Sequence, residues 1–152
     1  MLITRYACSM FNADLVELPA GETLTTPESA VNSRVYGMYV LSGAYEFTAT
    51  DDPQFVGRVV SEALFPNDVT CGATVQAIGD ANWVCFSQND DTRRTVTQMD
   101  VEGTAVLPAD TGFFMVKGTV QADGKTANQF QFFKPRATDI ELQGNGTLIL
   151  VR

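Results

Sequence analysis

The sequence predicts an all-β fold, either a sandwich or a barrel of short strands. Apolar residues recur at every second position in short segments, as they do in strands that bury one face. Turn-forming residues, mainly glycine, asparagine and aspartate, separate these segments at roughly ten-residue spacing, which is typical of sandwiches and barrels. No long stretch repeats its apolar positions with the period of about 3.6 residues that marks a helix.

The first two thirds of the chain supply most of the expected strands. These cover residues 35–41, 44–50, 55–60, 69–78, 82–87 and 95–101. Ser42-Gly43 indicates a tight hairpin or a bulge between the first two, and Gly79-Asp80 indicates a turn. Residues 57–64 are the best helical candidate, although they fit a strand as well.

The last third of the chain has the clearest hairpin signals. Its expected strands cover residues 112–121, 128–133, 137–142 and 147–151. Asp123-Gly124 lies between the first two, and Asp-Gly between strands is a strong hairpin signal. Residues 144–146, Gly-Asn-Gly, predict a second hairpin.

The sequence also contains a short internal repeat. Residues 18–22 read Leu-Pro-Ala-Gly-Glu, and residues 107–111 read Leu-Pro-Ala-Asp-Thr. Each stretch precedes a pair of apolar strands. Two sheets of a double-layered roll would produce such a repeat, and so would chance.

Residues 15–87 resemble the cupins, a family of small β-rolls. Three stretches carry the resemblance, at residues 15–22, 36–43 and 64–68. Gly21 and Gly43 match the two glycines of the first cupin motif, with extra residues between them, and Pro66 matches the proline of the second motif. The resemblance implies a jelly roll.

The metal ligands of the cupin motifs are missing from this chain. The paired-histidine positions fall near Pro27 and Ser29, the glutamate position falls near Arg34 or Tyr36, and Cys71 stands where the third histidine would be. The resemblance therefore implies a metal-free roll without a cofactor. Rolls of this kind are found among sugar-binding modules and among the virion structural proteins of tailed bacteriophages.

We therefore expect a cupin-like β-sandwich that forms a single domain over residues 1–152. Residues 15–101 would form the roll. Residues 102–152 would form C-terminal hairpins that complete the sandwich or make an oligomer contact.

Composition and charge exclude several classes of function. The chain has no histidine, which removes the most common general base and metal ligand, so we expect no catalytic residues and no enzyme. Its net charge of −8 disfavours binding to nucleic acid or to an anionic membrane. Cys71 and Cys85 lie in apolar stretches and are interpreted as buried free thiols. Acidic clusters at residues 51–52, 67–68, 89–91 and 100–102 are interpreted as turn residues rather than a calcium site.

Two groups of aromatic residues are candidate binding sites. Trp83, Tyr39 and Tyr45 could line the mouth of a barrel and stack on a sugar, although a core position is the preferred interpretation. The second group is a phenylalanine-rich hairpin with apolar residues on both faces, so either both faces are buried within the chain or one face meets another subunit. We favour the subunit interface, with these candidate residues: Phe113, Phe114, Phe130, Phe132, Phe133, Lys134 and Arg136.

These observations predict a structural or interaction protein rather than an enzyme. The leading hypothesis is a virion subunit that decorates a capsid or joins a tail, acts as a homo-oligomer with a trimer favoured, and binds capsid or tail proteins. The alternatives are a carbohydrate-binding module and a metal-free isomerase of the cupin type. No signal peptide is seen, so we expect synthesis in the host cytoplasm and localisation in the virion.

Overall fold

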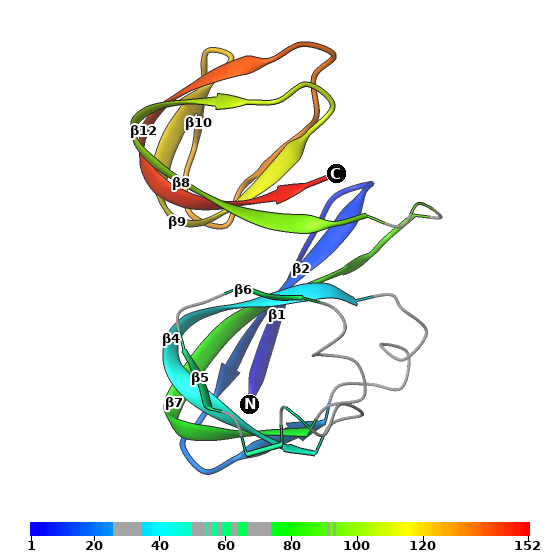
Figure 1. Ribbon diagram of the computed structural model, residues 1–152, viewed down its shortest axis with the longest axis vertical. Helices are drawn as coiled ribbons and strands as arrows, with labels where there is room; N and C mark the ends of the chain where they lie inside the picture. Colours follow the sequence, from blue (N-terminus) through cyan, green and yellow to red (C-terminus); the bar gives the residue numbers. More distant parts are fainter. Residues whose placement is uncertain are drawn as a thin grey trace. The chain divides into compact units, whose positions relative to one another are not determined.

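The structure, a computed structural model, consists almost entirely of antiparallel β-strands, which confirms the all-β prediction (Figure 1). It describes residues 1–25, 35–49, 54, 56–57, 59–61, 64–66, 74–90, 92 and 94–152. The chain divides into two compact units, Met1–Arg93 and Arg94–Arg152, and each has its own sheet. None of the described residues forms a helix that could cross a membrane.

The first unit contains a seven-stranded sheet in which two long strands lie at the centre. The strands are β1 (Leu2–Ala7), β2 (Phe11–Leu18), β3 (Thr23–Thr25), β4 (Val35–Ala49), β5 (Val59–Ser61), β6 (Leu64–Pro66) and β7 (Thr74–Gln88). The main path runs in the order β1-β2-β7-β4-β5, while β3 pairs with β7 and β6 pairs with β4. Strand β1 therefore lies at one edge of this sheet.

The second unit contains a five-stranded sheet. Its strands are β8 (Val96–Leu107), β9 (Gly112–Ala122), β10 (Lys125–Ala127), β11 (Phe132–Phe133) and β12 (Ile140–Val151). The order is β10-β9-β12-β8, and β11 also pairs with β9. Strand β12 is paired along both of its sides.

Alternation along the strands builds a separate core in each unit. In β2, Val16 and Leu18 are buried, whereas Glu17 between them is half-exposed. The core of the first unit, called here the β4–β7 core, comprises Val16, Leu18, Met38, Val40, Tyr45, Phe47, Val75, Ala77, Ala81 and Trp83. The core of the second unit comprises Val101, Leu107, Phe113, Met115, Val120, Ala122, Ala127, Phe133, Leu142, Leu148 and Leu150.

Glycines that suggest turns lie instead inside long strands. The Ser42-Gly43 bulge is confirmed, because β4 runs on through it with a register shift against β7. Gly43 has a φ of +72°, and a Cβ at this position would collide with the backbone oxygen of Asp80. The turns predicted at Gly79-Asp80 and at residues 144–146 are wrong, because β7 and β12 continue through them. A residue without a Cβ permits a close crossing of two strands as readily as a turn.

The Asp123-Gly124 hairpin is confirmed, with a shorter return strand than predicted. Asp123 and Gly124 have φ values of +51° and +73°, as the favoured two-residue hairpin turn requires. Ala122 pairs directly with Lys125 across this turn. The strand expected over residues 128–133 is reduced to β11.

The internal repeat at residues 18–22 and 107–111 corresponds to one type of turn that occurs in both units. The N–H of Ala20 donates to Oδ1 of Asp80 at 3.1 Å, and the N–H of Ala109 donates to Oδ1 of Asp139 at 2.8 Å. The next residue has a positive φ in both cases, +81° at Gly21 and +58° at Asp110. The repeated sequence thus encodes a repeated local geometry.

The structure does not test every expectation from the sequence. The predicted boundary between residues 101 and 102 falls inside β8, and the single domain over residues 1–152 stays a prediction. Residues 55, 58, 62 and 63 lie outside the described residues, and β5 forms a strand within both the strand expected over residues 55–60 and the helical candidate over residues 57–64. Cys71 also lies outside them.

Candidate functional site in the first unit

Tyr45 on β4 and Trp83 on β7 lie side by side in the β4–β7 core. Both side chains are fully buried, and their ring centroids are 5.1 Å apart. Phe47 contacts Tyr45 edge to face at 5.5 Å. Trp83 pairs with Val40 and Tyr45 pairs with Ala77 across the two strands, and all four residues belong to the β4–β7 core.

The polar atoms of these two residues are the unusual feature of this core. Tyr45 Oη and Trp83 Nε1 are buried, and neither has a hydrogen-bond partner among the described residues. A buried donor without a partner costs roughly 1–3 kcal/mol of stability, so such atoms are rare in folded proteins. The pair therefore marks a place where an acceptor group from outside the chain would be stabilising.

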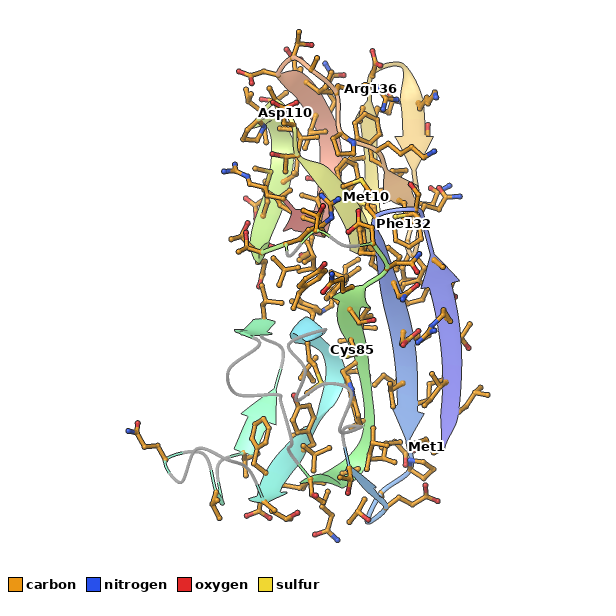
Figure 2. All side chains as sticks on the ribbon, turned by 90° about the vertical axis from the view of Figure 1, so that its right-hand side faces the viewer. Met1, Met10, Cys85, Asp110, Phe132 and Arg136 are labelled. Carbon is orange, nitrogen blue, oxygen red and sulfur yellow. The ribbon has the colours of Figure 1, made fainter. Side chains whose placement is uncertain are left out.

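Burial also sets the chemistry of Tyr45. Loss of solvation raises the pKa of its phenol well above the ordinary value, and the neighbouring Cys85 acts in the same direction. Tyr45 is therefore a neutral hydroxyl at physiological pH, able to donate and accept a hydrogen bond but not to act as a phenolate base. Cys85 is a half-buried thiol on β7 that forms no disulfide (Figure 2).

Tyr39 does not join this pair. It is buried, but its register partner on β7 is Val84, whereas Val40 beside it pairs with Trp83. Adjacent residues of a strand point to opposite faces, so Tyr39 lies on the other face of the sheet. Of the three aromatic candidates, the structure brings together only Tyr45 and Trp83, and it places all three inside rather than at an exposed mouth.

The phenylalanine-rich hairpin packs largely on itself. Phe113, Phe114 and Phe133 are buried, while Phe130 and Phe132 are half-buried. Phe113 stacks on Phe133 with centroids 5.1 Å apart, and Phe114 contacts Phe132 at 4.9 Å. The predicted subunit interface would need these rings at the surface, whereas the structure uses most of their area within the chain.

The two basic residues that follow this hairpin, Lys134 and Arg136, have different surroundings. Lys134 is exposed. Arg136 lies over the Phe133 ring at 4.6 Å, and its Nη1 donates to the carbonyl oxygen of Lys134 at 2.8 Å. Its Nε also contacts Asp123 Oδ2 at 3.4 Å. Arg136 therefore has partners within its own unit.

The structure describes few of the positions that correspond to the cupin metal ligands. Pro27, Ser29 and Arg34 lie outside the described residues. Tyr36 is buried, and its hydroxyl donates to the carbonyl oxygen of Thr92 at 3.0 Å. Across the described part of the chain, no group of three or more cysteine, aspartate or glutamate residues is placed to hold a metal ion.

Comparisons with known proteins find similarity at the level of structure. No protein-family model and no curated protein sequence matches the chain. A mannose 6-phosphate isomerase from Bacillus subtilis aligns over 94% of this chain and 75% of its own, with 11% identity and a TM-score of 0.58. HutD from Pseudomonas fluorescens aligns over 93% and 78%, with 13% identity and a TM-score of 0.60.

A cupin 2 conserved barrel domain protein from Leptotrichia buccalis aligns over 99% of this chain and 87% of its own, with 10% identity and a TM-score of 0.55. Identities this low establish a shared fold and nothing finer. The nearly all-β structure, its antiparallel sheets and these likenesses lead to one conclusion. The chain has a cupin-like β-sandwich fold.

Proposed function

We propose that this chain is a non-enzymatic binding protein that encloses a small, neutral, polar ligand in the first unit. The observation that carries the proposal is the pair of buried, unpartnered polar atoms, Tyr45 Oη and Trp83 Nε1. A ligand oxygen within hydrogen-bond distance of either atom would supply a missing hydrogen bond. Water alone could also fill such a place, so the tests below separate the two.

The surroundings of the pair define the class of ligand. The indole N–H of Trp83 only donates, whereas the neutral phenol of Tyr45 can donate or accept. The side chains packed with them in the β4–β7 core include Val40, Phe47 and Val75, which are apolar. A complementary ligand has an acceptor oxygen and an apolar face, and it carries no phosphate. A neutral sugar or a related polyol fits this description.

This proposal keeps the carbohydrate-binding alternative and changes its geometry. The sequence suggested exposed rings that stack on a sugar, whereas Tyr45 and Trp83 are enclosed. Isomerisation of a sugar requires a base, and the sequence has no histidine, the most common general base. We therefore favour binding over an isomerase of the cupin type.

The virion role, the capsid or tail partners and the virion location stay predictions. Their main support was a phenylalanine surface that could meet another subunit. Because Phe113, Phe114 and Phe133 are buried in the chain itself, that support is weaker than the sequence suggested.

A thermal-shift screen against neutral monosaccharides, disaccharides and polyols tests the binding proposal. A ligand at a hundred times its Kd adds about 2.7 kcal/mol of stability, which raises the Tm of a protein of this size by several degrees. We expect at least one such ligand, and we expect Tyr45→Phe to abolish its effect.

Tyr36→Phe is the matched control for this screen. Tyr36 is a buried tyrosine on the same strand, but its hydroxyl already has a partner in Thr92. The control should lose about 1 kcal/mol of stability and keep the full ligand shift. A ligand shift that survives Tyr45→Phe, or a screen without any shift, would overturn the proposal.

A further inference from the structure

We propose that β1 pairs edge to edge with β1 of a second copy of this chain, which gives a two-fold symmetric dimer. This inference is independent of the ligand proposed above. Among the described strands, β1 is the outer strand of its sheet and pairs with β2 on one side only. Figure 2 shows β1 beside β2, with the labelled Met1 at one end of this edge.

The open side of β1 carries backbone groups that no other described strand pairs with. The β1–β2 register is continuous over all six residues of β1, and the N–H of Cys8 donates to the oxygen of Phe11 at 3.0 Å in the same register. Hydrogen-bonding residues alternate in an antiparallel pair. The N–H and C=O groups of Ile3, Arg5 and Ala7 therefore point away from β2, where another strand can bind them.

Features that usually protect an edge strand are weak in β1. Natural edge strands are kept short or carry charges that repel a second copy. Arg5 supplies the one charged side chain of β1, and its guanidinium is held over β2 by two contacts of 2.8 Å to the Asp14 carboxylate. The opposing charge of Asp14 compensates that of Arg5, and the strand presents Leu2 and Ile3 with 60% and 49% of their surface exposed.

Other sheet edges among the described strands are better protected. Strands β5 and β10 have three residues each. Strand β8 is long, but it exposes Asp100 and Glu102, whose charges would repel those of a second copy. This contrast within one chain singles out β1 as the pairing edge.

One register suits the side chains of β1. A two-fold axis at Thr4 places Ile3 opposite the partner's Arg5 and Leu2 opposite the partner's Tyr6. Each such pair lies on one face of the joined sheets, where cross-strand neighbours interact. An axis at Arg5 would place two arginines opposite each other, which is unfavourable.

A hollow beside Leu2 gives the second copy a place for a side chain. It has a volume of about 530 Å³, and its lining combines the apolar Leu2, Leu18 and Pro19 with the polar Glu17, Asp80 and Asn82. Leu2 and Tyr6 lie on the same face of β1, because they are separated by an even number of positions. In the Thr4 register the partner's Tyr6 therefore lies next to this hollow.

Mass photometry and light scattering of the full chain, with any tag at the C-terminus, test this dimer. Ile3→Lys places a lysine opposite each arginine of the pair, and we expect the dimer Kd to rise about tenfold or more. Ile3→Glu changes the same side chain with the opposite charge, and it should keep the dimer. Val106→Lys, at a valine 58% exposed on β8, controls for a new surface charge.

Circular dichroism checks that each variant is folded. A monomeric wild-type chain would overturn the inference, whether or not the edge binds a different protein. Equal loss of the dimer in Ile3→Lys and Ile3→Glu, or loss in Val106→Lys, would also count against it. The ligand screen does not depend on any of these outcomes, so the two proposals can fail separately.

Discussion

At the scale of residues, position in the register decides what each aromatic side chain can do. In the sequence, Tyr39, Tyr45 and Trp83 are equally good candidates for a binding site. Alternation along the strand places Tyr39 and Val40 on opposite faces of the sheet. The sequence could not show that Tyr45 and Trp83 meet, since their contact depends on strands that are far apart in the chain. It could not show their unpartnered atoms either, because hydrogen-bond satisfaction is a property of the packed core.

The buried phenol of Tyr45 predicts a specific loss of stability at high pH. The unfolded chain loses this proton near its ordinary pKa, about 10, whereas the folded chain holds it to a higher pH. The contribution of Tyr45 is therefore complete below about pH 10, and it falls above that by up to about 1.4 kcal/mol per pH unit.

Urea unfolding between about pH 9 and pH 11 measures this effect. Tyr45→Phe should flatten the decline relative to wild type, while the other tyrosines titrate in both proteins. Identical slopes in the two proteins would show that Tyr45 is not buried as a neutral phenol.

At the scale of elements, the alternation of apolar residues predicted where strands lie, whereas turns predicted at glycines placed some strand ends wrongly. Residues 35–41 and 44–50 were expected as separate strands or as one with a bulge, and β4 is one strand with a bulge. Gly144 and Gly146 were expected in a turn, yet β12 runs through both. A glycine can lie in a turn or inside a continuous strand, and which of the two occurs depends on whether a distant strand packs closely against it.

The close crossing of β9 and β12 at Gly118 can be tested with a matched pair of alanine substitutions. Gly118 and Gly103 lie inside strands and have φ values of +76° and +89°. A Cβ at Gly118 would collide with the backbone oxygen of Asn145, whereas a Cβ at Gly103 would meet nothing within 4 Å. We expect Gly103→Ala to cost about 1–2 kcal/mol from backbone strain alone.

Gly118→Ala should cost about 1–3 kcal/mol more than Gly103→Ala, because the backbone of β12 must shift to make room. Chemical denaturation of the two variants gives the difference. Equal costs would mean that the two strands do not cross closely at this glycine.

At the scale of the whole molecule, the sequence predicted the fold more fully than the function. The glycine-bearing stretches at residues 15–22 and 36–43 indicated a cupin-like roll, and structures that align over most of the chain have that fold. Function was harder to predict, because the phenylalanine hairpin looks the same in sequence whether it packs within the chain or against a neighbour. Phe113 and Phe133 pack in the core of the second unit, which residues far apart in the sequence form together.

The central claim is that the first unit encloses a ligand between Tyr45 and Trp83. A crystal structure of the protein grown with the compound that gives the largest thermal shift tests it most directly. The account predicts electron density for that compound, with an oxygen about 2.7–3.2 Å from Tyr45 Oη or Trp83 Nε1. Density for water alone, partners for both atoms from the chain itself, or a ligand bound elsewhere would contradict it.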